Sequence, residues 1–175
     1  VLLTARAGRD AMAGVINSTG VVEAQTAVER NGRIIITGDA ETDVTLSGSI
    51  DASGQAKGET GGTIDVTGRK VSVADARISA DGDAGGGVIR LGGDERGSGD
   101  MAHAGRVSID KTSLISADAT GHGDGGKVVV WSDKHTAVTG TLTARGGAMG
   151  GDGGMVEVSS KGGLYLTGRI WLEAP

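Results

Sequence analysis

Short runs of alternating aliphatic and polar residues recur along the chain, and each run is entered through glycine. In these runs the second and fourth residues after the glycine are aliphatic, whereas the third varies freely. Period-two alternation puts one set of side chains on a buried face and is typical of a β-strand. The clearest runs are GRIII at 32–36, GTIDV at 62–66, GVIRL at 87–91, GKVVV at 126–130 and GMVEV at 154–158.

A second set of aliphatic positions follows each run, and most of these sets end on a small residue. Three short polar and glycine breaks, at 47–49, 139–141 and 167–169, divide such sets and predict a corner in the backbone. The sets are Val44, Leu46, Ile50, Ala52; Val71, Val73, Ile78, Ala80; Val107, Ile109, Ile115, Ala117; Val138, Leu142, Ala144; and Leu164, Leu166, Ile170, Leu172.

The spacing of the glycine-entered runs is that of a solenoid repeat. Equivalent residues are 30 positions apart from Ile34 to Ile64, 25 from Ile64 to Ile89 and 28 from Val128 to Val156. The step from Ile89 to Val128 is 39 positions, and it falls to about 25 if residues 92–105 form an inserted loop. With a less clear first turn through Leu3, Ile16, Val22 and Ala24, the chain makes about six coils.

These features predict an all-β fold, a right-handed parallel β-helix with coils of 25–30 residues. One coil has no partner for its apolar row, so only the coils above and below can cover it. The side chains of Ile64, Ile89, Val128 and Val156 are therefore expected to form one stack. An antiparallel sandwich also uses alternating strands, but it does not explain why the same residue type recurs at a fixed offset.

We interpret residues 1–175 as a single β-helix segment, with the 92–105 loop inserted between strands of one coil. The 34 glycines, one tyrosine, two tryptophans and absence of phenylalanine favour a thin core of Val, Ile, Leu and Ala. No polar cap is visible at either end, so we expect open terminal coils and a rod that continues beyond this segment.

Composition and charge exclude several functions. A net charge of −5 with scattered basic residues argues against a nucleic-acid partner, and no apolar run reaches the ~20 residues needed to span a membrane. The chain has no cysteine, which excludes a disulfide framework and a thiolate metal site. The chain does not open with a signal peptide. Because it does not begin with methionine, this absence carries no information about export.

Several motifs in the second half of the chain resemble a known family. They are ISADGDAGGGVIRLGGD at 78–94, LISADATGHGDGG at 114–126, GDGGKVVVW at 123–131, TGTLTARGG at 139–147 and GGDGGMVEVSSK at 150–161. Together they resemble the repeats of filamentous haemagglutinin-like exoproteins, large adhesins that Gram-negative bacteria export by two-partner secretion. The resemblance covers roughly the last 100 residues, and the first 60 are only compatible with it.

The resemblance implies a β-helical shaft that passes through an outer-membrane two-partner-secretion transporter to the cell surface. It also implies contact with a host or neighbouring cell in adhesion, biofilm formation or toxin delivery. The amino-terminal secretion domain that the transporter reads is not recognisable among the motifs. Without membrane insertion, the expected location is extracellular, on the surface of a Gram-negative bacterium.

An enzymatic β-helix that acts on polysaccharides is the less favoured alternative. A glycosidase needs two carboxylates at a cleft, and sugar clefts commonly carry aromatic platforms. Asp65 and Glu157 would share one outward column, but intervening coils keep them apart. The only aromatic residues are Trp131, Tyr165 and Trp171. We therefore assign no catalytic and no cofactor-binding residue.

Acidic residues recur just before the glycine-entered runs, at Glu59, Asp83, Asp124 and Asp152. A stack of carboxylates suggests calcium, but the spacing is irregular, and Asp and Gly are favoured in turns anyway. We interpret them as turn residues and assign no metal site. His103, His122 and His135 lack ligand spacing and are read as solvated surface residues.

Two further features can be interpreted either as functional sites or as ordinary structural features. Asn17 opens the sequence Asn-Ser-Thr, which fits a glycosylation acceptor but arises often by chance. The 92–105 loop interrupts the shaft, where repeat proteins often place function, yet its glycines and alanines offer little contact area. Two functional classes remain open: a rod segment of an adhesin, and a subunit of an extracellular filament that assembles head to tail.

Overall fold

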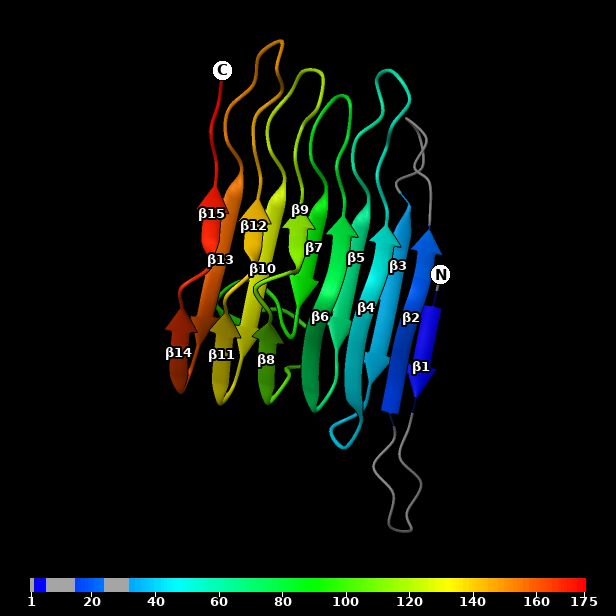
Figure 1. Ribbon diagram of the computed structural model, residues 1–175, viewed down its shortest axis with the longest axis vertical. Helices are drawn as coiled ribbons and strands as arrows, with labels where there is room; N and C mark the ends of the chain where they lie inside the picture. The colour runs from blue at the N-terminus through cyan, green and yellow to red at the C-terminus, as the bar shows by residue number, and fades with distance from the viewer. Residues whose placement is uncertain (1, 6–14, 24–31) are drawn as a thin grey trace.

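The computed structural model describes residues 2–5, 15–23 and 32–175, and it shows a parallel β-solenoid (Figure 1). One sheet, here called sheet A, contains six strands in the order β1-β3-β5-β7-β10-β13, joined by five turns of the solenoid. The all-β solenoid prediction is confirmed. The strands of sheet A are β1 (Leu2–Ala5), β3 (Arg33–Gly38), β5 (Thr63–Thr67), β7 (Val88–Leu91), β10 (Lys127–Ser132) and β13 (Met155–Ser160).

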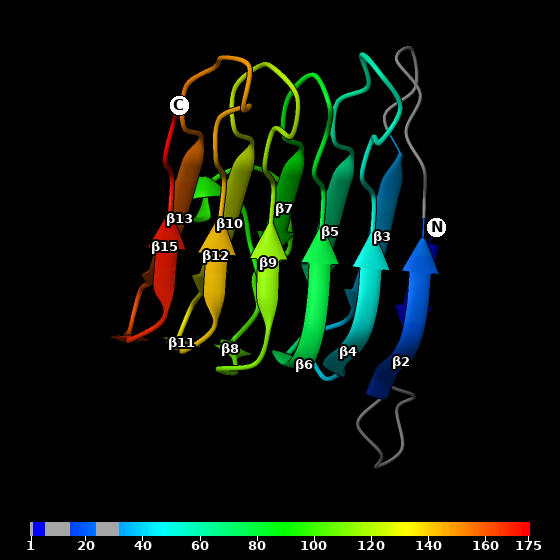
Figure 2. The ribbon, with the colours of Figure 1, turned by 45° about the horizontal axis from the view of Figure 1, so that its top comes forward.

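The second sheet, sheet B, contains nine strands and faces sheet A across the core (Figure 2). Its early strands are long, and in later coils each is replaced by two shorter strands. The strands of sheet B are β2 (Val15–Glu23), β4 (Asp43–Asp51), β6 (Lys70–Ser79), β8 (Arg106–Ile109), β9 (Leu114–Ser116), β11 (His135–Val138), β12 (Thr141–Thr143), β14 (Gly163–Leu166) and β15 (Arg169–Trp171).

The breaks within sheet B follow the predicted corners in part. Residues 139–140 separate β11 from β12, and residues 167–168 separate β14 from β15, as expected. The corner predicted at 47–49 is wrong, because β4 runs through it with only a register shift between Leu46 and Gly48. Gly48, at φ 76°, absorbs the distortion without ending the strand.

The predicted core stack is present. Ile64 pairs with Ile89, Ile89 with Val128 and Val128 with Val156, and Ile34 extends the column at its other end. The first four residues of this column are fully buried, and Val156 packs against them from the last coil. Columns of Val, Ile, Leu and Ala therefore fill the space between the sheets, as the thin aliphatic composition suggests.

The glycines before the sheet A strands allow the coils to approach closely. A Cβ atom added at Gly86 would lie 2.0 Å from the carbonyl oxygen of Ala117 in the next coil. The same clash would arise at Gly61 with Ala80 and at Gly125 with Ala144. Glycine at these positions, each directly before the glycine that enters a run, thus lets each coil cross the corner against its neighbour.

The carboxyl-terminal coil exposes its apolar side chains. Leu164, Leu166 and Ile170 are 51%, 41% and 39% exposed, although they continue the core columns of Thr136, Val138 and Leu142. At the other end β1 and β2 form the expected first coil, with Leu3, Ile16 and Val22 in strands. Ala24, also named in that expectation, lies outside the described residues.

The only helix in the described ranges is the single 3-10 turn η1 (Glu95–Gly97), within residues 92–105 between β7 and β8. No helix of sufficient length and apolarity to cross a membrane occurs in the part of the chain that the structure describes.

Candidate functional site

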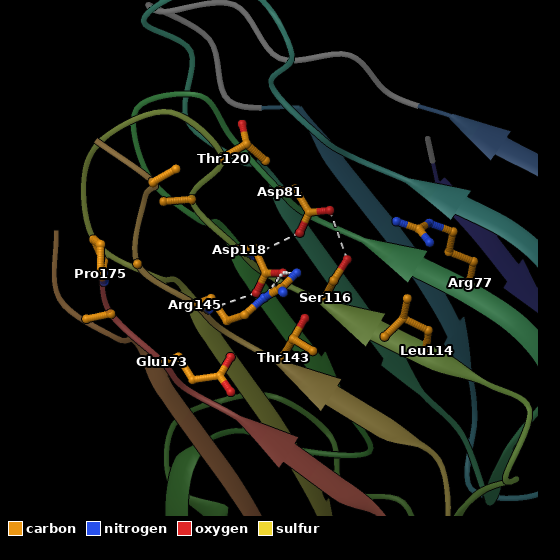
Figure 3. Close-up of a pocket in the computed structure, with 14 residues that line it drawn as sticks. Arg77, Asp81, Leu114, Ser116, Asp118, Thr120, Thr143, Arg145, Glu173 and Pro175 are labelled. Carbon is orange, nitrogen blue, oxygen red and sulfur yellow. Dashed lines mark hydrogen bonds and ion pairs between the residues drawn. The ribbon is translucent and has the colours of Figure 1, made fainter. Parts of the chain in front are cut away.

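A groove follows one corner of the solenoid, where the sheet B strands end (Figure 3). Its volume is about 580 Å³. Ser116 and Thr143 contribute hydroxyl groups from β9 and β12, and two residues further along each of these coils the chain reaches a polar position. In successive coils this position, here called the polar ladder, is occupied by Ser53, Asp81, Asp118, Arg145 and Glu173.

Within the polar ladder, the side chains of Ser53, Asp81 and Asp118 each bind the backbone of the next coil. The hydroxyl of Ser53 accepts from the N–H of Asp81 at 3.2 Å, and the Asp81 carboxylate accepts from the N–H of Asp118 at 2.8 Å. The Asp118 carboxylate in turn accepts from the N–H of Arg145 at 2.7 Å. The side chains thus satisfy backbone donors at a corner where the coils no longer pair as regular strands.

Asp118 is the most tightly held member of the polar ladder. Its side chain is only 7% exposed, and its Oδ2 atom accepts hydrogen bonds from Nε and Nη2 of Arg145 at 2.9 and 2.7 Å. The guanidinium supplies a positive charge that compensates for removing the carboxylate from water. Both oxygen atoms of Asp118 are therefore occupied by Arg145, through its side chain and its backbone.

Asp81 lies beside this pair in a less favourable environment. Burial raises the pKa of its carboxyl group, and the nearby Asp118 charge adds to that effect, while hydrogen bonds from Asp118 and Ser116 oppose it. A pair of carboxylates with different environments is the usual basis of acid–base chemistry. Here one of the two is held by Arg145, so the arrangement acts chiefly to join adjacent coils.

We expect amide substitutions of the two carboxylates to have opposite effects at neutral pH. Asp81→Asn keeps an acceptor for the Asp118 N–H and removes a destabilising charge, so the melting temperature should rise slightly. Because the pKa of Asp81 is raised by folding, its ionised form lowers stability above that pKa. The advantage of the variant should therefore shrink as the pH falls through the folded pKa.

Asp118→Asn should instead lower stability by about 1–2 kcal/mol, because it leaves the Arg145 guanidinium without its counter-charge. Thermal unfolding of both variants between pH 3 and pH 7 measures the two effects. Equal destabilisation by both amides at pH 7 would contradict this account of the polar ladder.

The 92–105 loop, whose glycines and alanines were expected to offer little contact area, is closely packed against the solenoid. It lies over the outer face of sheet A, where it covers Val129 and Trp131, which are 0% and 7% exposed. Gly93 and Gly97 approach the indole of Trp131 so closely that an added Cβ would lie 2.4 Å from its ring atoms in each case. The missing side chains let the loop backbone lie against the ring.

Polar contacts hold this loop to four coils. The Thr67 hydroxyl of β5 donates to the carbonyl of Ala102 at 2.7 Å, and the Lys127 ammonium of β10 donates to Glu95 at 2.9 Å. The N–H of Arg96 donates to the Glu157 carboxylate of β13 at 3.0 Å. Asp94 at the loop entrance accepts from Arg90 of β7 at 2.6 Å. The loop therefore acts as a clasp across β5, β7, β10 and β13.

The carboxylates considered for catalysis lie apart, as expected. Register places Asp65, Arg90, Val129 and Glu157 in one outward column, so two strands separate the two acids. Asp65 is bound by Arg33 and Arg90 at 2.7 Å each, whereas Glu157 binds the clasp loop. Each acid thus has a structural partner of its own.

Three of the four acidic residues at the glycine corners accept hydrogen bonds from backbone N–H groups, but only Glu59 does so within its own turn, as predicted. Glu59 accepts from Ala56, and Asp83 accepts from Gly58 in the preceding coil. Asp124 accepts from the N–H of Asp152 in the following coil at 2.8 Å. Within the described residues, no group of three or more His, Cys, Asp or Glu side chains is arranged to hold a metal ion.

These contacts predict that calcium does not stabilise the fold. Adding millimolar calcium should leave the melting temperature unchanged, because ligand binding to the folded state alone would raise it. An increase of many degrees, absent from the Asp124→Ala and Asp152→Ala variants, would contradict the prediction.

The three histidines differ from one another. His122 and His135 are exposed, as predicted for surface residues. His103 was wrongly assigned to that group, because its side chain is only 22% exposed and packs against Trp131 with ring centroids 5.9 Å apart. Its Nδ1 atom lies 3.3 Å from Asp133. The candidate glycosylation residue Asn17 lies in β2, paired with Thr45 of β4.

Sequence reasoning missed the polar ladder, although a signal was present. Residues 78–81 and 115–118 both read Ile-Ser-Ala-Asp, and the structure places them side by side. The alanines mark the end of the core column, and the aspartates that follow occupy the corner. The repeated Ile-Ser-Ala-Asp sequence, in which a polar residue directly follows the small residue at the end of a core set, is thus the signal that locates the polar ladder.

Comparison with known proteins gives one informative result. No protein-family model matches the sequence, and no match was found among curated proteins. The structure is similar to the HMW1 secretion domain from Haemophilus influenzae, with 28% sequence identity and a TM-score of 0.73. The match covers 98% of this chain, which spans 47% of that domain. The chain is therefore similar over nearly its whole length to part of a secretion domain, a relation that the motifs had not revealed.

Proposed function

We propose that this chain is a non-enzymatic rod segment of a protein that a Gram-negative bacterium exports to its surface through an outer-membrane two-partner-secretion transporter. Its role there would be adhesive or structural. The observation that carries the proposal is the similarity to the HMW1 secretion domain over 98% of the chain. It agrees with the motifs of residues 78–161, which resemble haemagglutinin-like repeats on independent grounds.

The fold suits export through a narrow pore. Every sheet A strand from β3 onward pairs with the strand of the coil before it, at a separation of 25–39 residues from Ile34 to Val156. Coils can therefore form in order as the chain emerges, each using the previous coil as a template. No cysteine is present to form a cross-link before export.

Deleting the gene of the partner transporter in the source bacterium tests the proposal. An antibody to this segment should then detect the protein inside the cells but not at the surface or in the medium, and a plasmid-borne transporter should restore export. Undiminished surface protein in the deletion strain would refute export by this route.

A second candidate function is that of a subunit in an extracellular filament. It would use the same parallel pairing that joins the coils within the chain, in which Leu164, Leu166 and Ile170 continue the columns of Thr136, Val138 and Leu142. A coil from a second copy could extend these columns, and head-to-tail contacts that do not close into a ring propagate into a fibre. Sedimentation should then show concentration-dependent association that Leu166→Lys with Ile170→Lys abolishes. A monodisperse monomer at high concentration would exclude this candidate.

A further inference from the structure

Basic residues gather at the corner where the chain passes from sheet A into β6, β8, β11 and β14. The tails of these strands are aligned along one edge of the solenoid (Figure 1). The side chains come from four successive coils, and all are exposed. We call this set the basic corner; it consists of Arg69, Lys70, Arg106, Lys134, His135 and Lys161.

The register of sheet B places several of these basic residues directly opposite one another. Lys70 of β6 pairs with Arg106 of β8, which pairs with His135 of β11. Paired residues on adjacent strands are separated by about 4.8 Å, and like charges such as those of Lys70 and Arg106 destabilise a sheet at that position. On its other side Lys70 pairs with Asp43 of β4, which offsets part of this repulsion for Lys70 but not for Arg106. A ligand that carries negative charges at similar intervals would relieve the repulsion.

Only some of these cations have a carboxylate partner. Asp43 binds Arg69 through two contacts of 2.8 Å, and this hydrogen-bonded pairing lowers the pKa of Asp43. Asp133 lies 2.8 Å from the ammonium of Lys161. Within the described ranges no ion pair involves the three other permanently charged members, Lys70, Arg106 and Lys134.

The charges line a recess rather than a flat surface. A groove of about 320 Å³ is bounded by Asp43, Arg69, Lys70, Gly105, Arg106 and Lys134. Gly105 lies between Arg69 and Lys134 in the backbone ladder, donating to the first and accepting from the second at 2.9 Å. Having no side chain, Gly105 leaves the recess open between the two cations.

We propose that the basic corner binds a linear anionic polysaccharide, laid along the solenoid axis so that successive acidic groups meet successive coils. Cations repeated at the strand spacing match a polymer with regularly spaced sulfate or carboxylate groups. A bilayer would not enter so narrow a recess, and it would require apolar residues to insert. Single-stranded nucleic acid would need aromatic stacking platforms, and the groove has no aromatic lining residue.

The inference deepens the proposed adhesive role, on which it rests for its biological meaning, but it is tested separately. Heparin serves as the probe, with neutral dextran as the uncharged control. Calorimetry at low salt should show heparin binding that weakens steeply as salt is added, and no binding of dextran. Arg106→Glu with Lys134→Glu should weaken heparin binding by about tenfold or more.

A matched control reverses two positive charges outside the basic corner. Lys57→Glu with Lys111→Glu alters two exposed cations outside the basic corner and should weaken heparin binding by less than about threefold. Melting curves and circular dichroism establish that both double variants fold.

Three results would overturn the proposal. They are absence of heparin binding by the folded wild-type chain, equal losses in the two double variants, and stronger binding to phosphatidylserine vesicles than to heparin through the same residues. Failure of heparin binding with intact transporter-dependent export would remove the polysaccharide site and leave the proposed function standing.

Discussion

Replacing Val128 with aspartate should unfold the coils around β10. Val128 is fully buried in the column between Ile89 and Val156, so the variant places an unpaired carboxylate among aliphatic side chains. Such a charge costs several kcal/mol, which is a large part of the stability of a small protein. Because each coil is covered only by its neighbours, the loss should spread to β7 and β13. Circular dichroism and hydrogen exchange measure the loss.

Val88→Asp is the matched control. Val88 precedes Ile89 in the sequence but is partly exposed on the outer face of sheet A, in register with Lys127. The same chemical change there should shift the free energy of unfolding by less than about 1 kcal/mol. A Val128→Asp variant as stable as Val88→Asp would show that the assignment of buried and exposed faces is wrong.

Trp131→Ala should have the second-largest effect, a loss of about 3 kcal/mol. The indole lies between sheet A and the clasp loop, where it packs against His103 and the backbone at Gly93 and Gly97. Removing it leaves a cavity under the loop and ends its main apolar contact. Amide exchange within residues 92–105 should therefore accelerate more than exchange in the core strands.

The second tryptophan provides the comparison. Trp171 lies on the last coil and is 40% exposed, so Trp171→Ala should change stability by less than about 1 kcal/mol. If both substitutions have the same effect, or if loop exchange is unchanged in Trp131→Ala, the loop is not held by the indole.

The fold could be predicted because each repeat signals the same packing requirement. Aliphatic residues at period two define the buried face, and their recurrence every 25–30 residues defines which strands stack. Those two periods were sufficient to place Ile64, Ile89, Val128 and Val156 in one column. They also indicated that a 39-residue step contains an insertion, because no other interval between runs is so long.

The sites could not be predicted to the same extent, because their contacts are made outside the periodic core. The clasp loop contacts Trp131 because glycine allows close approach of its backbone, and composition alone makes such a loop look unattached. His103 and Asp133 meet across adjacent coils, but both lie outside the aliphatic columns that carry the sequence pattern. The basic corner depends on register, since Lys70, Arg106 and His135 become neighbours only when the coils are aligned.

The stacked register of the coils is the central claim, and disulfide formation between introduced cysteines tests it most directly. The chain has no native cysteine, and the hydroxyl oxygens of Ser72 and Ser108 lie 3.5 Å apart although 36 residues separate them. Ser72→Cys with Ser108→Cys should therefore oxidise readily to an intramolecular disulfide. Ser72→Cys with Ala137→Cys spans two coils, about 9.6 Å at the usual strand spacing, and should not. Efficient cross-linking of the second pair, or none of the first, would contradict the solenoid register.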